Sequence, residues 1–221
     1  MNNTTLTTRL KQYALTQGID LIGITSAKPF IIQRKNETVV DPKELLNDAK
    51  AIIVTGFYIN EKDNMILTEP NKARGRYNSY DVKAFMPMEK YYIKTIQKFL
   101  EREGYKVEFN KNYRIPDKMA AVRAVLGKYG KNSVVITERY GSFIMFVTLV
   151  TNAPLDYEEF SINETECGKC EICIKSCPTR AIYAPFKVKR NSCITAWLWG
   201  GFIPINLREK QQNRLFAAVN A

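Results

Sequence analysis

The sequence predicts an α/β domain with a mixed sheet and helices on both faces, followed by a small cysteine-rich domain. Short apolar runs alternate with amphipathic helical patterns from the N-terminus to about residue 151, an order that places helices against a sheet. After that point the pattern changes, and four of the 5 cysteines lie between Cys167 and Cys177. We therefore divide the chain into two predicted domains, residues 1–155 and 156–221.

Four helices are predicted from apolar residues at helical spacing and from the residues that begin or end each helix. Asp41 followed by Pro42 is a start signal, because an aspartate caps exposed N–H groups and proline suits the first helical position. Gly18 and Gly104 are suited to end the helices that precede them. The predicted helices span residues 4–17, 42–49, 88–103 and 117–126.

Strands are predicted where short runs are apolar or alternate between apolar and polar residues. The run over residues 51–59 is apolar throughout, which is typical of a strand that is buried on both faces. The polar residues 60–80 are longer than an ordinary connection, so they predict either a binding loop or a disordered segment. The predicted strands span residues 19–24, 51–59, 105–109, 134–137 and 142–151.

The chain is basic, with 33 Lys and Arg against 22 Asp and Glu and a formal net charge of +11. This charge favours polyanions, acidic proteins or phosphate-bearing ligands as partners, with nucleic acid as one candidate. The basic residues form no known nucleic-acid motif, so a plain solvated surface is the alternative. No run of about 18 uncharged apolar residues and no leader peptide appear, which predicts a cytoplasmic protein without a membrane partner.

The cysteine run has the form Cys167-x2-Cys170-x2-Cys173-x3-Cys177 followed directly by proline. This spacing is typical of the loop with which bacterial-type ferredoxins bind an iron–sulfur cluster. A structural zinc site would use two cysteine pairs, usually with histidine, and this chain has 0 His. A disulfide framework belongs to small secreted proteins. The run therefore predicts a ferredoxin-like domain with a 4Fe–4S cluster.

The fourth cluster ligand is left open by the spacing. Cys167, Cys170 and Cys173 are the first three predicted ligands, whereas in two-cluster ferredoxins the fourth cysteine of such a run binds the other cluster. The fourth ligand is therefore either Cys177 or the more distant Cys193. Because the chain has 5 cysteines, it can complete one four-cysteine cluster by itself.

A glycine-containing segment precedes the strand predicted at residues 134–137. Gly127 and Gly130, with Lys131 and Ser133, could form a loop whose backbone N–H groups bind a phosphate or a carboxylate. The spacing is neither that of a P-loop nor that of a dinucleotide fingerprint, so an ordinary glycine turn is the alternative.

Four segments together resemble the epoxyqueuosine reductase family, whose relatives are the corrinoid-dependent reductive dehalogenases. The segments are residues 115–133, residues 141–143, the cysteine run and residues 190–194. The resemblance implies that the α/β domain is similar to a vitamin B12-binding fold and holds cobalamin near the cluster domain. It also implies that Gly127, Gly130, Lys131 and Ser133 lie on the cofactor face.

The sequence departs from that family at the proton donor. The family has an acidic residue upstream of the glycine segment, and the matching residues 110–114 contain no carboxylate. Tyr113 and Asp117 are the residues left for this role. The family's second set of cluster cysteines and its tRNA-binding C-terminal repeats have no counterpart here, which predicts a shortened, divergent member with one cluster.

The resulting hypothesis is a 4Fe–4S electron-transfer protein that acts as a corrinoid-dependent reductase related to epoxyqueuosine reductase. Its electron donor would be a ferredoxin or a flavodoxin, and its substrate a small molecule or another compound that the sequence does not identify. The alternative is a non-catalytic protein, either an iron–sulfur redox sensor or a partner subunit.

Overall fold

The structure is a computed structural model that describes residues 5–33, 37–59, 86–158, 167–194, 196 and 207. The predicted loop over residues 60–80 lies outside these ranges. The chain divides into two compact units, an α/β unit and a unit that we call the cysteine unit. The α/β unit comprises Met1–Tyr58, Met88–Gly127 and Ile144–Ile162, and the cysteine unit comprises Ile59–Pro87, Lys128–Phe143 and Asn163–Ala221. The domain boundary at residues 155 and 156 stays a prediction.

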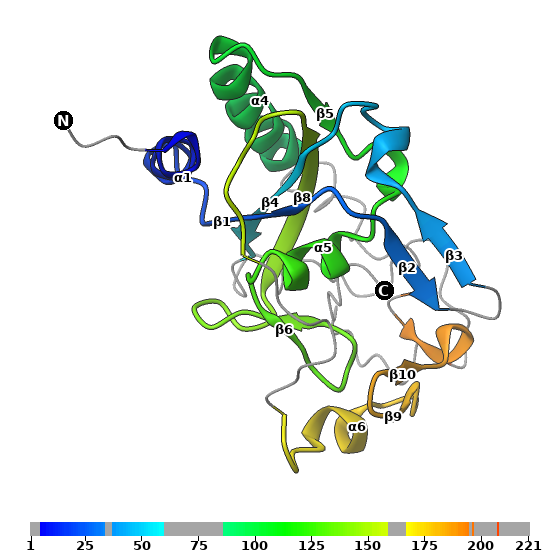
Figure 1. The fold of residues 1–221 in the computed structure, drawn as a ribbon. Coiled ribbons are helices and arrows are strands. Elements are labelled where there is room, and N and C mark those ends of the chain that lie inside the picture. Colours follow the sequence, from blue (N-terminus) through cyan, green and yellow to red (C-terminus); the bar gives the residue numbers. More distant parts are fainter. Residues whose placement is uncertain are drawn as a thin grey trace. The chain divides into compact units, whose positions relative to one another are not determined.

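The α/β unit contains a four-stranded sheet whose strands lie in the order β1, β4, β8 and β5 (Figure 1). The strands are β1 (Leu21–Ser26), β4 (Ala51–Tyr58), β8 (Ile144–Thr151) and β5 (Val107–Phe109). The predicted α/β class is confirmed. Each adjacent pair in this sheet is antiparallel, which corrects the mixture of strand directions that we predicted. Apolar runs indicate burial and carry no information about the direction of a strand.

Three of the predicted helices are present in the α/β unit, and two of them end where glycine was expected to end them. Gly18 has φ +81° and Gly104 has φ +84°, a backbone conformation that residues with a Cβ rarely adopt. The helix expected to extend to residue 126 ends at Arg123, because Val125 has φ +61°. The helices are α1 (Leu6–Thr16), α4 (Met86–Arg102) and α5 (Asp117–Arg123).

The helix predicted over residues 42–49 is wrong in its length. Asp41 does cap the segment, since its carboxylate accepts a hydrogen bond from the Lys43 N–H at 2.9 Å. The segment is nevertheless a single 3₁₀ turn, η1 (Pro42–Glu44). The N–H of Lys50 already donates to the Thr151 carbonyl at the end of the sheet. The chain must therefore become extended before a second helical turn can form.

Helices cover both faces of the sheet. Val54 pairs with Thr148, so these two side chains share a face, and the Thr148 hydroxyl donates to Asp117 of α5 at 2.6 Å. Phe57 lies three positions from Val54 and points to the opposite face, where its ring meets Tyr92 of α4 edge-on at 5.7 Å. Seven of the eight residues of β4 and all eight of β8 are buried, as the apolar run predicted for β4.

A hairpin that we did not predict joins the sheet to the η1 turn. Its strands are β2 (Phe30–Gln33) and β3 (Glu37–Val40), which pair antiparallel. Phe30 is fully buried, and the guanidinium of Arg123 lies 3.7 Å from the centre of its ring. The same guanidinium donates hydrogen bonds to the carbonyls of Lys28 and Pro29. Arg123 of α5 therefore fixes the start of the hairpin.

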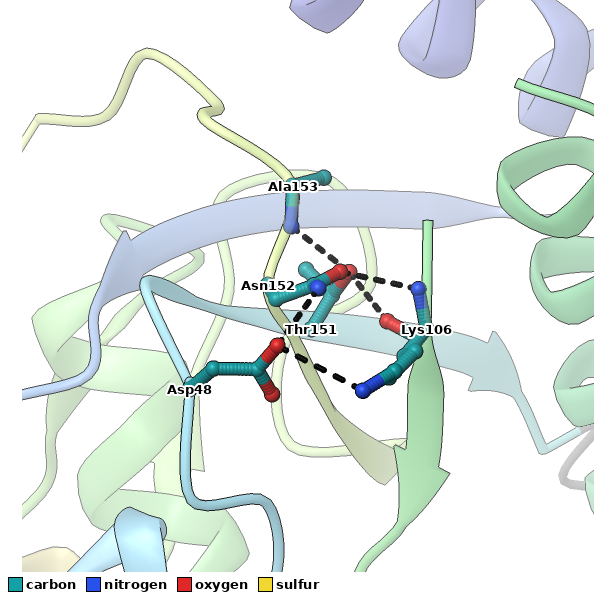
Figure 2. Close-up of polar contacts among 5 residues, drawn as sticks. All are labelled: Asp48, Lys106, Thr151, Asn152 and Ala153. Carbon is teal, nitrogen blue, oxygen red and sulfur yellow. Dashed lines mark hydrogen bonds and ion pairs between the residues drawn. The ribbon is translucent and has the colours of Figure 1, made fainter. Parts of the chain in front are cut away.

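Polar side chains hold together the end of the sheet where β8 finishes (Figure 2). Asn152 accepts a hydrogen bond from the Lys106 N–H at 2.8 Å and donates to the Asp48 carboxylate at 2.8 Å. The Thr151 hydroxyl donates to the Lys106 carbonyl and accepts from the Ala153 N–H. The Asn152 amide holds the pKa of Asp48 below its ordinary value. These contacts join the starts of β4 and β5 to the end of β8.

The cysteine unit consists of short elements. A hairpin of β6 (Lys128–Tyr129) and β7 (Val135–Ile136) comes first, and β7 confirms the strand predicted there. The cysteine run contains α6 (Ile172–Ser176) and leads into a second hairpin, β9 (Ile182–Ala184) with β10 (Lys187–Val188), and then into η4 (Arg190–Ser192). None of the helices in the described ranges combines the length and the apolar content that crossing a bilayer requires.

Candidate iron–sulfur site

The cysteines lie on a tight turn, a short helix and the residue after it. The N–H of Cys170 donates to the Cys167 carbonyl at 2.8 Å, which closes the first turn of the run. Cys173 lies within α6, and Cys177 directly follows that helix with an extended backbone. Cys170 is exposed, and the other cysteines, including Cys193 at the end of η4, are half-buried. None of the five thiols is fully buried, so they are accessible for metal loading.

The first three thiols lie within electrostatic reach of one another. Burial raises the pKa of the Cys173 thiol above its ordinary value, and the charges of Cys167 and Cys170 raise it further. Mutual repulsion of this kind opposes ionisation in the absence of a metal. A bound cation reverses it, because it favours the thiolate form that ligates metals.

Cys177 has a different environment. Burial raises the pKa of its thiol, but N–H groups of Ile182, Thr179 and Ala181 and the Thr179 hydroxyl outweigh this, so that the pKa is lowered overall. The Thr179 hydroxyl oxygen lies 3.7 Å from the Cys177 sulfur. Hydrogen bonds of this kind stabilise a thiolate and help to set the reduction potential of iron–sulfur clusters.

These donors fit an iron–sulfur cluster by their chemistry. Four thiols occur at ferredoxin spacing on one short segment, and the surroundings of Cys177 favour its thiolate, the form that ligates iron. In the described ranges, no three His, Cys, Asp or Glu side chains converge on the position of a single metal ion. Cys177 and Cys193 are both half-buried, so burial alone does not select the fourth ligand.

The glycine segment forms part of the β6–β7 hairpin and of the turn within it. The Gly130 N–H donates to the Val134 carbonyl at 2.8 Å, and the Ser133 N–H donates to the Gly130 carbonyl at 2.9 Å. A Cβ on Gly130 would lie 2.7 Å from both the Asn132 amide oxygen and Ile136. These two N–H groups are therefore used within the hairpin, and the placement of Gly127, Gly130 and Ser133 on a cofactor face stays a prediction.

Lys131 is the member of this segment that contacts the cysteine run. Its ammonium Nζ donates to the carbonyls of Gly168 and Cys170, at 2.7 Å and 2.8 Å. Its own carbonyl accepts a hydrogen bond from the Phe186 N–H at 2.8 Å. The sequence contained no signal for this contact, because nothing in a lysine's local pattern shows which distant carbonyls it meets.

The two predicted proton donors lie in different environments in the α/β unit. Asp117 is buried and accepts hydrogen bonds from Thr148 and, at 3.1 Å, from the Asn110 amide. Burial raises the pKa of Asp117 to about 7, against these two hydrogen bonds, which lower it. Tyr113 is half-exposed and has φ +50° in the turn before α5. Their catalytic roles stay predictions.

Asn110 organises the segment that connects these two residues. Its side chain accepts from the Ile115 N–H at 2.9 Å and donates to the Ile115 carbonyl at 2.8 Å. It is itself 1% exposed. The stretch without a carboxylate that we identified in the sequence is thus held by an inward-pointing amide.

The fold and the cysteine motif define an iron–sulfur protein with an α/β unit. Residues 160–183, which include the whole run from Cys167 to Cys177, match a family model described as a 4Fe-4S binding domain. The chain therefore carries a 4Fe–4S motif of the ferredoxin type, as predicted from its cysteine spacing.

The chain is also similar in sequence to the epoxyqueuosine reductases. It is 28% identical to epoxyqueuosine reductase of Bacillus anthracis over an alignment 234 residues long, which covers 92% of this chain and 60% of that protein. A 137-residue match to the Vibrio cholerae enzyme has 32% identity and covers 57% of this chain and 37% of the relative. The chain thus spans about 60% of the length of the curated relatives that it matches along most of its sequence.

Solved structures show the same fold. A structure of epoxyqueuosine reductase from Bacillus subtilis has a TM-score of 0.75 and 23% identity, with coverage of 96% of this chain and 62% of that chain. A catabolic reductive dehalogenase has a TM-score of 0.64 and 15% identity, with coverage of 85% of this chain and 28% of that chain. The predicted likeness to both groups of proteins is confirmed at the level of the fold.

Proposed function

We propose that this protein is a 4Fe–4S electron-transfer protein that acts as a reductase related to the epoxyqueuosine reductases. The observation that carries the proposal is the ferredoxin-type cysteine run in a chain that resembles these enzymes over 92% of its residues. A 4Fe–4S cluster supplies single electrons at a potential that its protein surroundings set.

Cys167, Cys170, Cys173 and Cys177 are the proposed ligands of the cluster. The hydrogen bonds to the Cys177 sulfur support its choice as the fourth ligand, since they favour the thiolate. The family match also includes Cys177 and ends at residue 183, before Cys193. Loss of the cluster from Cys193→Ser, with retention in Cys177→Ser, would reverse this assignment.

A corrinoid is the second cofactor that we propose, and the α/β unit would hold it. The support is the likeness in fold to a reductive dehalogenase whose structure is described as suggesting a mechanism for B12-dependent dehalogenation, with a TM-score of 0.62. A bound corrinoid would supply the reductive chemistry itself. The N–H groups of Gly130 and Ser133 and the ammonium of Lys131 already make hydrogen bonds within the cysteine unit, and their contact with a corrinoid stays a prediction.

The formal net charge of +11 supports acidic partners. A ferredoxin or a flavodoxin is the proposed electron donor. RNA is the proposed polyanionic substrate class, since one of the similar structures is an epoxyqueuosine reductase with an epoxyqueuosine-modified tRNA stem loop, at a TM-score of 0.74. A non-catalytic iron–sulfur sensor is the competing function, and the absence of a carboxylate from residues 110–114 favours it.

Anaerobically purified full-length protein tests these proposals in two steps. Iron and sulfide content with an electron paramagnetic resonance spectrum shows whether a 4Fe–4S cluster is present, and zinc in place of iron would contradict the electron-transfer function. Titration with cobalamin then separates the two candidates. A base-off spectrum supports the reductase, and a normal cluster without cobalamin uptake supports the sensor.

A further inference from the structure

Lys131 joins the two sides of the cysteine run to the β6–β7 hairpin. Its ammonium binds the Gly168 and Cys170 carbonyls on the N-terminal side of the run. Its carbonyl binds the N–H of Phe186, which lies between β9 and β10 after the run. All of these residues belong to the cysteine unit. One residue thus contacts the backbone near the start of the run and the backbone after its end.

The loop held in this way is largely exposed. Cys170 and its neighbours Gly168 and Lys169 are exposed, and Cys167 is half-buried, so apolar packing contributes little to their positions. Hydrogen bonds from a charged donor are stronger than those between neutral groups. The two bonds from the Lys131 ammonium are therefore well placed to fix the carbonyls on either side of Lys169.

The charge of Lys131 has a second effect. Its ammonium lies 2.8 Å from the backbone carbonyl of Cys170, so a positive charge sits against a predicted ligand residue. A 4Fe–4S cluster becomes more negative on reduction, and nearby positive charge stabilises the reduced form. Removal of this charge would consequently make the cluster harder to reduce.

We propose that Lys131 is a positioning residue of the cluster site, which holds Cys167 and Cys170 ready for ligation and raises the reduction potential of the cluster. The proposal rests on the proposed cluster function. It gives Lys131 a role toward the cluster in place of the corrinoid contact that the sequence resemblance implied.

Three variants of the full-length chain separate these effects. Lys131→Met removes both the charge and the donor, and Lys131→Arg keeps the charge with a different donor geometry. Lys169→Met is the matched control, because it removes an exposed charge from the same loop and leaves the Lys131 contacts in place. Each protein is loaded anaerobically, its cluster is titrated electrochemically, and its loss to a chelator is followed by absorbance.

We expect Lys131→Met to have a lower midpoint potential than both the wild type and Lys169→Met. It should also lose its cluster roughly 3- to 10-fold faster, the range expected for charged hydrogen bonds at a partly exposed site. Lys131→Arg should retain most of the potential and lose the cluster at an intermediate rate. Equal potentials and equal rates of loss in Lys131→Met and Lys169→Met would overturn the proposal.

A measurement without the cluster distinguishes failure of this proposal from failure of the proposed function. Hydrogen exchange of residues 167–171 in apo protein should be faster in Lys131→Met than in the wild type and in Lys169→Met. If the wild type binds no iron, the electron-transfer function fails, and the exchange data still decide whether Lys131 fixes the loop. Unchanged exchange in Lys131→Met would then reject that role.

Discussion

The sheet of the α/β unit and the cysteine run differ in what stabilises them. All eight residues of β8 are buried, and its neighbour β4 exposes only Tyr58. In the described stretch of residues 167–194, by contrast, Ala181 and Ile194 are the only buried residues. Burial of apolar surface is the main favourable term in folding, so the sheet possesses a source of stability that the cysteine run lacks.

This difference indicates that metal binding and folding are coupled in the cysteine run. Small metal-binding segments often fold only with their metal, because the free energy of ligation substitutes for a hydrophobic core. The α/β unit, by contrast, has a buried apolar core of its own. Changes that act on one region and leave the other intact test this difference in stability.

The largest expected effect comes from removal of a cluster ligand. Cys170→Ala should abolish the broad absorption at about 400 nm that iron–sulfur proteins show, since no neighbouring residue can take the place of the lost thiolate ligand. Hydrogen exchange should rise throughout residues 167–194 and stay unchanged in β4 and β8. Lys169→Ala is the control. Retention of a full cluster in Cys170→Ala would contradict both the ligand assignment and the coupling.

The second prediction concerns catalysis at the α/β unit. We expect this protein to reduce epoxyqueuosine in tRNA far more slowly than the Bacillus subtilis enzyme, even with cobalamin and a strong reductant. A positioned proton donor typically contributes ~10²–10⁴-fold, and residues 110–114 contain no carboxylate. Mass spectrometry of nucleosides after incubation with modified tRNA measures the product. Comparable conversion would mean that Tyr113 or Asp117 supplies the proton.

The third prediction concerns the stability of the sheet. Leu149 is fully buried in β8, and Leu149→Ala should lower the free energy of unfolding of the α/β unit by ~2–5 kcal/mol. Leu15→Ala is the matched control, because Leu15 is 54% exposed in α1 and should cost little. Denaturant titration by circular dichroism measures both. Iron content of the folded variant should stay unchanged, and a loss of iron would show that the two regions depend on each other.

The last prediction is a pH dependence of stability that comes from Asp117. Burial raises its pKa from 3.8 to about 7, with a further contribution from the charge of Glu89. Between these values the folded state retains a proton that the unfolded chain releases. Stability should therefore fall as the pH rises through this window, by up to about 1.4 kcal/mol per pH unit, and level off above pH 7. Below pH 3.8 both states are protonated, so the stability contribution of Asp117 is fully present and no longer changes with pH.

Asp117→Asn removes this titration and keeps an oxygen that can accept from Thr148 and Asn110. Subtraction of its unfolding free energy from that of the wild type isolates the Asp117 contribution across the pH range. A difference that does not change between pH 4 and 7 would show that the carboxyl is ionised in the folded protein.

The sequence was informative where a local pattern has one physical meaning. The apolar run of β4 requires burial on both faces, and the cysteine spacing suits one kind of metal loop. Asp41 was correctly identified as a cap, but its helix length depended on the Lys50 contact with Thr151, which is distant in sequence. The β2–β3 hairpin was missed for the same reason, because Arg123 holds its start from another element.

In the candidate site, too, local patterns were predicted from the sequence and contacts between distant residues were not. The thiols were identified from their spacing, whereas the Lys131 contact joins positions 37 and 39 residues apart and had no local signal. Asp117 was selected as an acidic residue near the expected donor, and burial with Thr148 and Asn110 became visible only in the folded chain. Long-range hydrogen bonds are the part of the site that residue patterns do not encode.

The strand order determines when the sheet can be completed while the ribosome synthesises the chain. β8 lies between β4 and β5 in the sheet, yet it follows both of them in the sequence (Figure 1). The pairing of Ala51 with Thr151 must therefore await residue 151, which makes the closing contact of the sheet a late one. The cysteines leave the ribosome shortly after that strand. The nascent α/β unit thus becomes able to complete its sheet just before the thiols become available for metal loading.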